Sequence, residues 1–123
     1  MSATVMIVED EPSIVTPLTF LMRQQGIDVD IITDGAEVIP AIEARMPDVV
    51  LLDVMLPSRN GFELCEAIRQ RTEWDDIKVV MLTVKNREVD MEKGLAVGAD
   101  DYITKPFAID EVVTTVQKHL SST

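Results

Sequence analysis

The stretch VMIVEDEP, residues 5–12, raises the question that decides the fold. Four apolar residues, Val5–Val8, run directly into the acids Glu9, Asp10 and Glu11, and Pro12 follows. An unbroken run rich in Val and Ile is typical of a strand that is covered on both faces of a parallel sheet. A buried strand that ends in three carboxylates indicates a functional site at that end of the strand.

The same pattern recurs along the chain, because short apolar runs alternate with amphipathic stretches. The predicted strands are Val5–Val8, Val29–Ile32, Val49–Leu52, Val79–Leu82 and, as the weakest, Tyr102–Ile103. The predicted helices begin after a cap at Asp10 or Ser13, near Asp34, after Asn60, near Arg87 and near Ile109. The first stops at Gly26, Pro47 follows the end of the second, the third has Ile68 facing inward, the fourth ends at Gly98, and the fifth runs to about Leu120. Five strand–helix units in series predict a doubly wound α/β domain.

Composition limits the function further. A chain of 123 residues is long enough for one domain with a real core, so we expect a single domain over residues 1–123. The formal net charge of −11 argues against direct binding of nucleic acid. No apolar run approaches the roughly 20 residues of a membrane span, and no signal peptide precedes the first strand. The single cysteine, Cys65, fits a reducing cytoplasm and is expected to face the core from a helix.

Polar residues follow four of the predicted strands. Glu9 and Asp10 follow the first, Asp53 the third, Thr83 the fourth and Lys105 the fifth. Ligands of open α/β sheets bind outside the carboxyl ends of the strands, so we expect these five side chains to converge there. Each alone has a simpler explanation, such as a helix cap or a surface lysine, but their combination indicates a site.

Three clustered carboxylates cannot all remain ionised without a counter-charge, because like charges raise one another's pKa. A hard divalent cation resolves this, and Mg²⁺ suits two or three carboxylates together with water. Asp53 can then act as a nucleophile, with the metal and Lys105 offsetting the charge of an incoming phosphoryl group.

With these residues in place, the chain resembles the response-regulator receiver domain of two-component signalling, the CheY-like fold. The resemblance rests on VMIVEDEP, PDVVLLDVMLPSRNGFELCEAIR, VVMLT and GLAVGADDYITKPF, and it covers nearly the whole chain. It implies a flavodoxin-like sheet of five parallel strands in the order 2-1-3-4-5 with five helices.

The resemblance also implies a role for each site residue. Asp53 matches the phosphoacceptor and Thr83 the switch hydroxyl, while Tyr102 matches the switch aromatic and Lys105 the phosphate-contacting lysine, with a cis peptide to Pro106. The implied Mg²⁺ ligands are Glu9, Asp10, Asp53 and the backbone carbonyl of Met55. Glu9 departs from the commonest pattern, since many members carry Asp there.

The implied function is a phosphorylation-activated switch, and not an enzyme beyond its own phosphorylation and dephosphorylation. It takes its phosphoryl group from a sensor histidine kinase or a phosphotransfer protein. Three other readings fit less well. A haloacid-dehalogenase-like phosphatase needs a second Asp where Met55 stands, and a flavodoxin-like FMN binder needs a phosphate loop in place of EDEP. A degenerate receiver would lack an acid or the lysine.

The output is predicted to act through the surface of the fourth helix, fifth strand and fifth helix on a downstream protein or output domain. The alternative is a receiver fragment of a winged-helix transcription regulator. The acids of that branch are present, but Met91, Thr115 and Gln117 stand where it tends to carry basic residues. We therefore expect a monomer or a weak dimer.

Overall fold

The computed structural model describes residues 3–84, 92–93 and 95–120. Its strands are β1 (Thr4–Val8), β2 (Asp28–Ile32), β3 (Val49–Asp53), β4 (Lys78–Val84) and β5 (Asp101–Lys105). Its helices are α1 (Pro12–Gln24), α2 (Val38–Ala44), α3 (Gly61–Arg69) and α5 (Ile109–Leu120), with two short 3-10 turns, η1 (Gly35–Glu37) and η2 (Thr72–Trp74).

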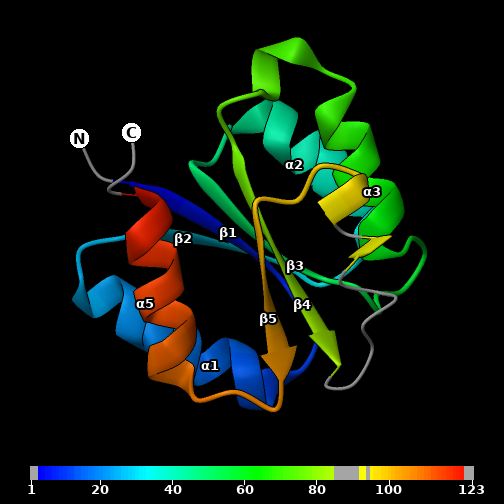
Figure 1. The fold of residues 1–123 in the computed structure, drawn as a ribbon. Coiled ribbons are helices and arrows are strands. Elements are labelled where there is room, and N and C mark those ends of the chain that lie inside the picture. The colour runs from blue at the N-terminus through cyan, green and yellow to red at the C-terminus, as the bar shows by residue number, and fades with distance from the viewer. Residues whose placement is uncertain (1–2, 85–91, 94, 121–123) are drawn as a thin grey trace.

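The five strands form one sheet in the order β2-β1-β3-β4-β5, and every neighbouring pair is parallel. In Figure 1, α1 and α5 lie on one face of this sheet and α2 and α3 on the other. The predicted doubly wound, flavodoxin-like fold is therefore confirmed. The fourth predicted helix, from Arg87 to Val97, lies mostly outside the described residues; residues 92–93 and 95–96 have helical backbone.

Successive residues of a strand point to opposite faces, so each central strand contributes to two cores. Met6 and Val8 of β1 belong to the core beneath α2 and α3. Val5 and Ile7 belong to the core beneath α1 and α5. All four are fully buried, which explains why the sequence of β1 has no polar alternation.

The start of α1 differs from the prediction. Neither Asp10 nor Ser13 caps this helix, because Glu11 occupies the N-cap position and makes no side-chain capping bond. Pro12 stands at the first helical position, where its missing N–H and fixed φ suit a helix start.

Two other helix starts follow the expected chemistry. The Asn60 side chain accepts a hydrogen bond from the Glu63 N–H at 2.9 Å and donates one to the Glu63 carboxylate at 2.7 Å. Such reciprocal bonds hold the first turn of α3. Asp34 caps η1 by accepting a hydrogen bond from the Ala36 N–H at 2.9 Å.

Two predictions made from the sequence, one about Cys65 and one about membrane spans, can be compared with the structure. Cys65 is buried as predicted, and its thiol lies 3.7 Å from the Val97 carbonyl oxygen. Within the described part of the chain, no helix is long and apolar enough to cross a membrane.

Candidate functional site

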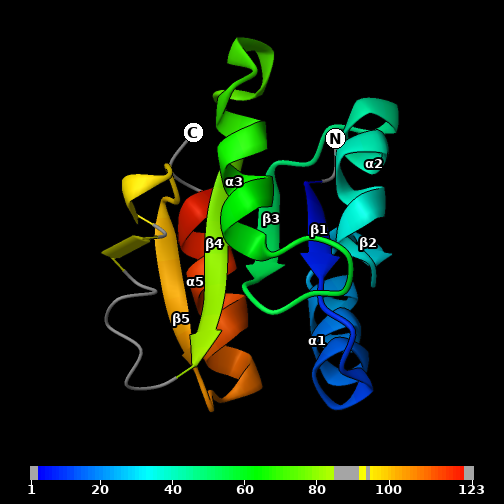
Figure 2. The same cartoon turned by 90° about the vertical axis from the view of Figure 1, so that its right-hand side faces the viewer.

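The parallel sheet brings the carboxyl ends of its strands to one edge of the molecule. The arrowheads of β1, β3, β4 and β5 all point the same way in Figure 2. The residues at or just beyond these ends are Glu9, Asp10, Asp53, Thr83 and Lys105. The structure thus places all five predicted side chains at the same edge of the sheet.

Asp53, the last residue of β3, is held from two sides. Its Oδ1 atom accepts a hydrogen bond from the Met55 N–H at 3.1 Å, and its Oδ2 atom lies 3.1 Å from the Lys105 ammonium. Asp53 is only 5% exposed. Although the side chain of Met55 points to solvent, its backbone is directed to this carboxylate.

Lys105 joins Asp53 to Glu9. The Lys105 ammonium lies 2.7 Å from Oε1 of Glu9, and the two N–H groups of Asp10 and Glu11 donate to Oε2 of Glu9 at 3.1 and 3.3 Å. The longer side chain of glutamate thus folds back onto its own backbone and still reaches the lysine. The cis peptide expected between Lys105 and Pro106 is present.

The electrostatics of the site follow from this crowding. Burial raises the pKa of Glu9 to about 7, and the nearby Asp53 adds to the rise while Lys105 opposes it. Burial alone would lower the pKa of Lys105, but the two carboxylates raise it above its ordinary value. The single ammonium of Lys105 faces two buried carboxylates, those of Glu9 and Asp53. A further positive charge at the site would therefore stabilise the ionised form of both.

A third carboxylate completes this group. Oxygen atoms of Glu9, Asp10 and Asp53 all lie within 4.8 Å of one another, with Asp10 exposed and the other two buried. Oxygen donors with excess negative charge are the ligands that Mg²⁺ prefers. The acidic cluster is therefore compatible with Mg²⁺.

Thr83 in β4 and Tyr102 in β5, the two predicted switch residues, differ in their surroundings. Thr83 is buried, and its hydroxyl has no hydrogen-bond partner within the described residues. Buried hydroxyls are normally paired, so the Thr83 hydroxyl is an exception among the described residues, as is that of Thr19. Tyr102 is half-buried and packs against the core beneath α2 and α3.

Glycine residues that the sequence analysis did not single out shape the same edge. A Cβ atom on Gly61 would lie 2.5 Å from the Asp53 carbonyl oxygen, so only glycine allows α3 to begin against β3. Gly35 approaches the β3–α3 loop, residues 54–60, in the same way. The Asn–Gly and Asp–Gly pairs at 60–61 and 34–35 were the available signals.

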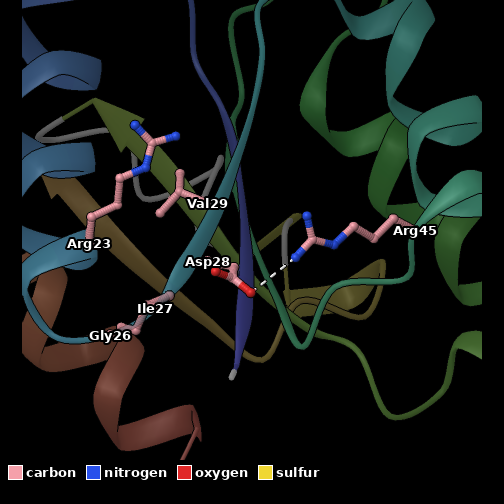
Figure 3. Close-up of a pocket in the computed structure, with 6 residues that line it drawn as sticks. All are labelled: Arg23, Gly26, Ile27, Asp28, Val29 and Arg45. Carbon is pink, nitrogen blue, oxygen red and sulfur yellow. Dashed lines mark hydrogen bonds and ion pairs between the residues drawn. The ribbon is translucent and has the colours of Figure 1, made fainter. Parts of the chain in front are cut away.

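Another hollow lies elsewhere and does not belong to this site. Figure 3 shows it around Gly26, Ile27 and Asp28, at the amino end of β2, with Arg23 and Arg45 beside it. The charge of Arg45 is already used inside the chain, since its guanidinium lies 3.2 Å from Asp28 and 3.4 Å from Asp30. This hollow is at the opposite end of the strands from Asp53.

The fold and the cluster together define the class of protein: an α/β domain with an acidic site and one lysine at the carboxyl edge of its sheet. The family model of the response regulator receiver domain matches residues 5–117. The chain belongs to this family, whose members are in general phosphorylation-activated switches of two-component signalling.

Solved structures agree with this assignment. The receiver domain of the TMAO respiratory system response regulator TorR is 33% identical, with a TM-score of 0.89 over 98% of both chains. The chemotaxis response regulator CheY4 of Vibrio cholerae is 28% identical, with a TM-score of 0.89 over 97% of this chain and 99% of that one. The receiver domain of a sensor histidine kinase from Pseudomonas aeruginosa PAO1 was solved with a magnesium ion in its active-site cleft. It is 26% identical, with a TM-score of 0.86 over 98% and 99% of the two chains.

Proposed function

We propose that residues 1–123 form a switch that accepts a phosphoryl group on Asp53. The observation that carries this proposal is the double hold on the Asp53 carboxylate by the Lys105 ammonium and the Met55 N–H. An aspartate held only for structural reasons needs no other acids beside it, yet the buried Glu9 and the exposed Asp10 both adjoin Asp53.

The proposed reaction is a direct transfer. One oxygen of Asp53 forms a bond to phosphorus while the bond from phosphorus to the donor breaks and the donor atom keeps the electron pair. Lys105 offsets the charge of the transferred group and holds Asp53 in place beforehand.

The chain's own ligands for Mg²⁺ are Glu9, Asp10, Asp53 and the backbone carbonyl of Met55. When bound, Mg²⁺ would neutralise the oxygens of the phosphoryl group. Before that, Lys105 offsets part of the charge of Glu9 and Asp53, which keeps the two carboxylates close together.

The proposed switch uses Thr83 and Tyr102. The Thr83 hydroxyl, which has no partner in the part of the chain that the structure describes, gains an acceptor when a phosphoryl group is attached to Asp53, so it turns toward the site. Tyr102 then fills the space that Thr83 leaves. One charge thus selects between two packing arrangements of the same core.

The proposed donors are a sensor histidine kinase or a phosphotransfer protein in the cytoplasm. A hollow beside Lys105 supports a protein donor, because the apolar side chains of Ile14, Phe107 and Ile109 line it. A helix that carries a phosphohistidine could cover these side chains while its phosphoryl group reaches Asp53.

The experiment that tests the proposal is intact-mass spectrometry after incubation with acetyl phosphate and Mg²⁺. We expect one added phosphate on the wild type and none on Asp53→Asn. Peptide mapping after borohydride trapping should place the modification on Asp53. Undiminished labelling of Asp53→Asn would refute the assignment.

A further inference from the structure

The β3–α3 loop, residues 54–60, carries the backbone group that holds Asp53. The loop is closed at its base, where the Gly61 N–H donates to the Val54 carbonyl at 2.9 Å. Inside it, the Met55 N–H donates to Asp53 and the Arg59 N–H donates to the Pro57 carbonyl at 2.8 Å. The position of Met55 therefore depends on how the remainder of the loop is held.

The turn between β2 and η1 holds that remainder through Gly35. The Gly35 N–H donates to the Pro57 carbonyl oxygen at 3.1 Å. A Cβ atom on Gly35 would lie 2.7 Å from the Arg59 carbonyl oxygen and 3.1 Å from the Pro57 carbonyl oxygen. Backbone oxygens cannot rotate away as side chains can, so any side chain at residue 35 must displace the loop. Gly35 is not at positive φ, so glycine is needed here for space alone.

Asp34, the residue before Gly35, contacts the loop with its side chain. The Ala36 N–H donates to the Asp34 carboxylate at 2.9 Å, and this bond, together with the nearby Ser58 side chain, lowers the pKa of Asp34. Ser58 has a φ of 71°, a left-handed conformation that side chains rarely adopt. The strained residue of the loop thus lies beside the Asp34 side chain of the neighbouring turn.

We propose that Asp34 and Gly35 are positioning residues for the phosphoacceptor site. Gly35 binds the Pro57 carbonyl through its N–H and lies against Arg59, while Asp34 lies beside Ser58. Through the loop, these contacts fix the Met55 backbone, whose N–H donates to Asp53. The proposal rests on the proposed function in one respect, since that function assigns the Met55 carbonyl to Mg²⁺. It adds that the site depends on the turn at Asp34 and Gly35, although this turn carries none of the proposed reacting groups.

The test compares Gly35→Ala with Gly26→Ala. Gly26 has a φ of 78° and would have no atom within 4 Å of an added Cβ, so alanine there strains the backbone far from the site. Three quantities are measured: the thermal midpoint, the Met55 amide shift and hydrogen exchange without metal, and Mg²⁺ affinity by calorimetry.

In Gly35→Ala we expect the Met55 amide shift to move and its exchange to accelerate. We also expect Mg²⁺ affinity to fall about tenfold, the size of effect seen for residues that orient metal ligands. Gly26→Ala should lower the thermal midpoint and leave Met55 and Mg²⁺ affinity unchanged. If Gly35→Ala is folded and both its Met55 amide exchange and its Mg²⁺ affinity equal those of the wild type, the proposal is overturned.

A second set of variants keeps the test decisive if Gly35→Ala does not fold. Asp34→Ala and Ser58→Ala should each weaken Mg²⁺ binding, and the double variant should be no weaker than the weaker single one, because both remove one contact. Additive losses would argue against this contact. Failure of the wild type to be phosphorylated would refute the proposed function, whereas the metal-free Met55 measurements would still judge the role of the turn.

Discussion

Glu9 is almost completely enclosed, and its carboxylate shares one lysine with Asp53. Because the pKa of Glu9 is raised from 4.5 to about 7, the folded protein holds this proton over a pH range in which the unfolded chain has lost it. Deprotonation therefore favours the unfolded state. The metal-free protein should lose stability from Glu9 as the pH rises between 4.5 and about 7.

Glu9→Gln should remove this pH-dependent loss. We expect the variant to gain about 1–3 kcal/mol relative to the wild type between pH 5 and about 8. Urea unfolding in excess chelator at several pH values measures the difference. Glu11→Gln is the matched control, since Glu11 is an exposed neighbour. Parallel pH profiles of Glu9→Gln and the wild type would contradict the raised pKa.

Asp10 is the exposed member of the acidic cluster and is expected to act mainly through Mg²⁺. Asp10→Ala should abolish most of the rise in thermal midpoint that Mg²⁺ produces in the wild type, because a ligand stabilises only the state that binds it. Without metal, the variant should be at least as stable as the wild type. Glu11→Ala serves as the control with the same charge change, and an equal response of both variants would argue against Asp10 as a ligand.

At the scale of elements, Arg69 connects the end of α3 to two neighbouring segments. Its guanidinium donates to the carbonyl oxygens of Gly98 at 2.9 Å and Ile77 at 2.8 Å, and it pairs with Asp100 at 2.7 Å. Asp100 in turn accepts a hydrogen bond from the Val79 N–H at 2.8 Å. One side chain thus joins α3, the start of β4 and the turn before β5.

Arg69→Met keeps an unbranched apolar side chain but removes the guanidinium group, so these acceptors lose their donor. We expect a loss of about 2–4 kcal/mol in the free energy of unfolding, because two partly buried carbonyl oxygens lose their donor and the ion pair with Asp100 is lost as well. Chemical denaturation measures it. Arg71→Met is the comparison, since Arg71 pairs with the exposed Glu43 and covers Trp74, and it should cost less. If both variants lost the same free energy of unfolding, the contacts of Arg69 would stabilise the fold no more than those of Arg71.

The elements were largely predictable from sequence, and their irregularities were not. The predicted bounds of α5, Ile109–Leu120, agree with the structure because Val112, Val113 and Val116 lie on one buried face. The turn η1 was missed because Asp34 caps it in the way that an N-cap residue caps an α-helix. A cap in the sequence therefore does not distinguish a 3-10 turn from the first turn of an α-helix. The contacts of Arg69 leave no local pattern, because its partners lie far away in the chain.

The candidate site divides in the same way. The convergence of Glu9, Asp53 and Lys105 was predictable, because parallel strands bring their carboxyl ends to one edge. The contact of Gly35 with the β3–α3 loop was not, since it depends on backbone atoms of two separate turns. Asp–Gly indicates a turn, but it does not identify what lies against that turn.

At the scale of the whole molecule, two acids near the proposed output surface, Asp100 and Asp101, already have partners within the chain. Asp100 pairs with Arg69, and Asp101 lies 3.0 Å from His119 and 3.8 Å from Lys118. Burial would raise the pKa of Asp101, but His119, the Tyr102 N–H and Lys118 lower it. Asp100 and Asp101 are therefore less available to a second copy of the chain.

We accordingly predict a monomer or weak dimer with and without beryllofluoride. Exposed ion pairs contribute only about 0–1 kcal/mol each, so a tight dimer needs several, and a net charge of −11 opposes association. Light scattering at tens of micromolar, in low and in physiological salt, measures the molar mass. A tight dimer that forms only with beryllofluoride would favour the winged-helix regulator instead.

The buried thiol of Cys65 is a built-in probe for local opening of the fold. Burial raises its pKa to about 11, so almost no reactive thiolate exists at neutral pH. Its sulfur lies against the Val97 carbonyl, so a thiol reagent can reach it only after α3 and the segment around Val97 separate. Because there is one cysteine in the chain, each modified molecule records a single opening event. The speed of that modification reports, without any added label, how often this side of the domain comes apart.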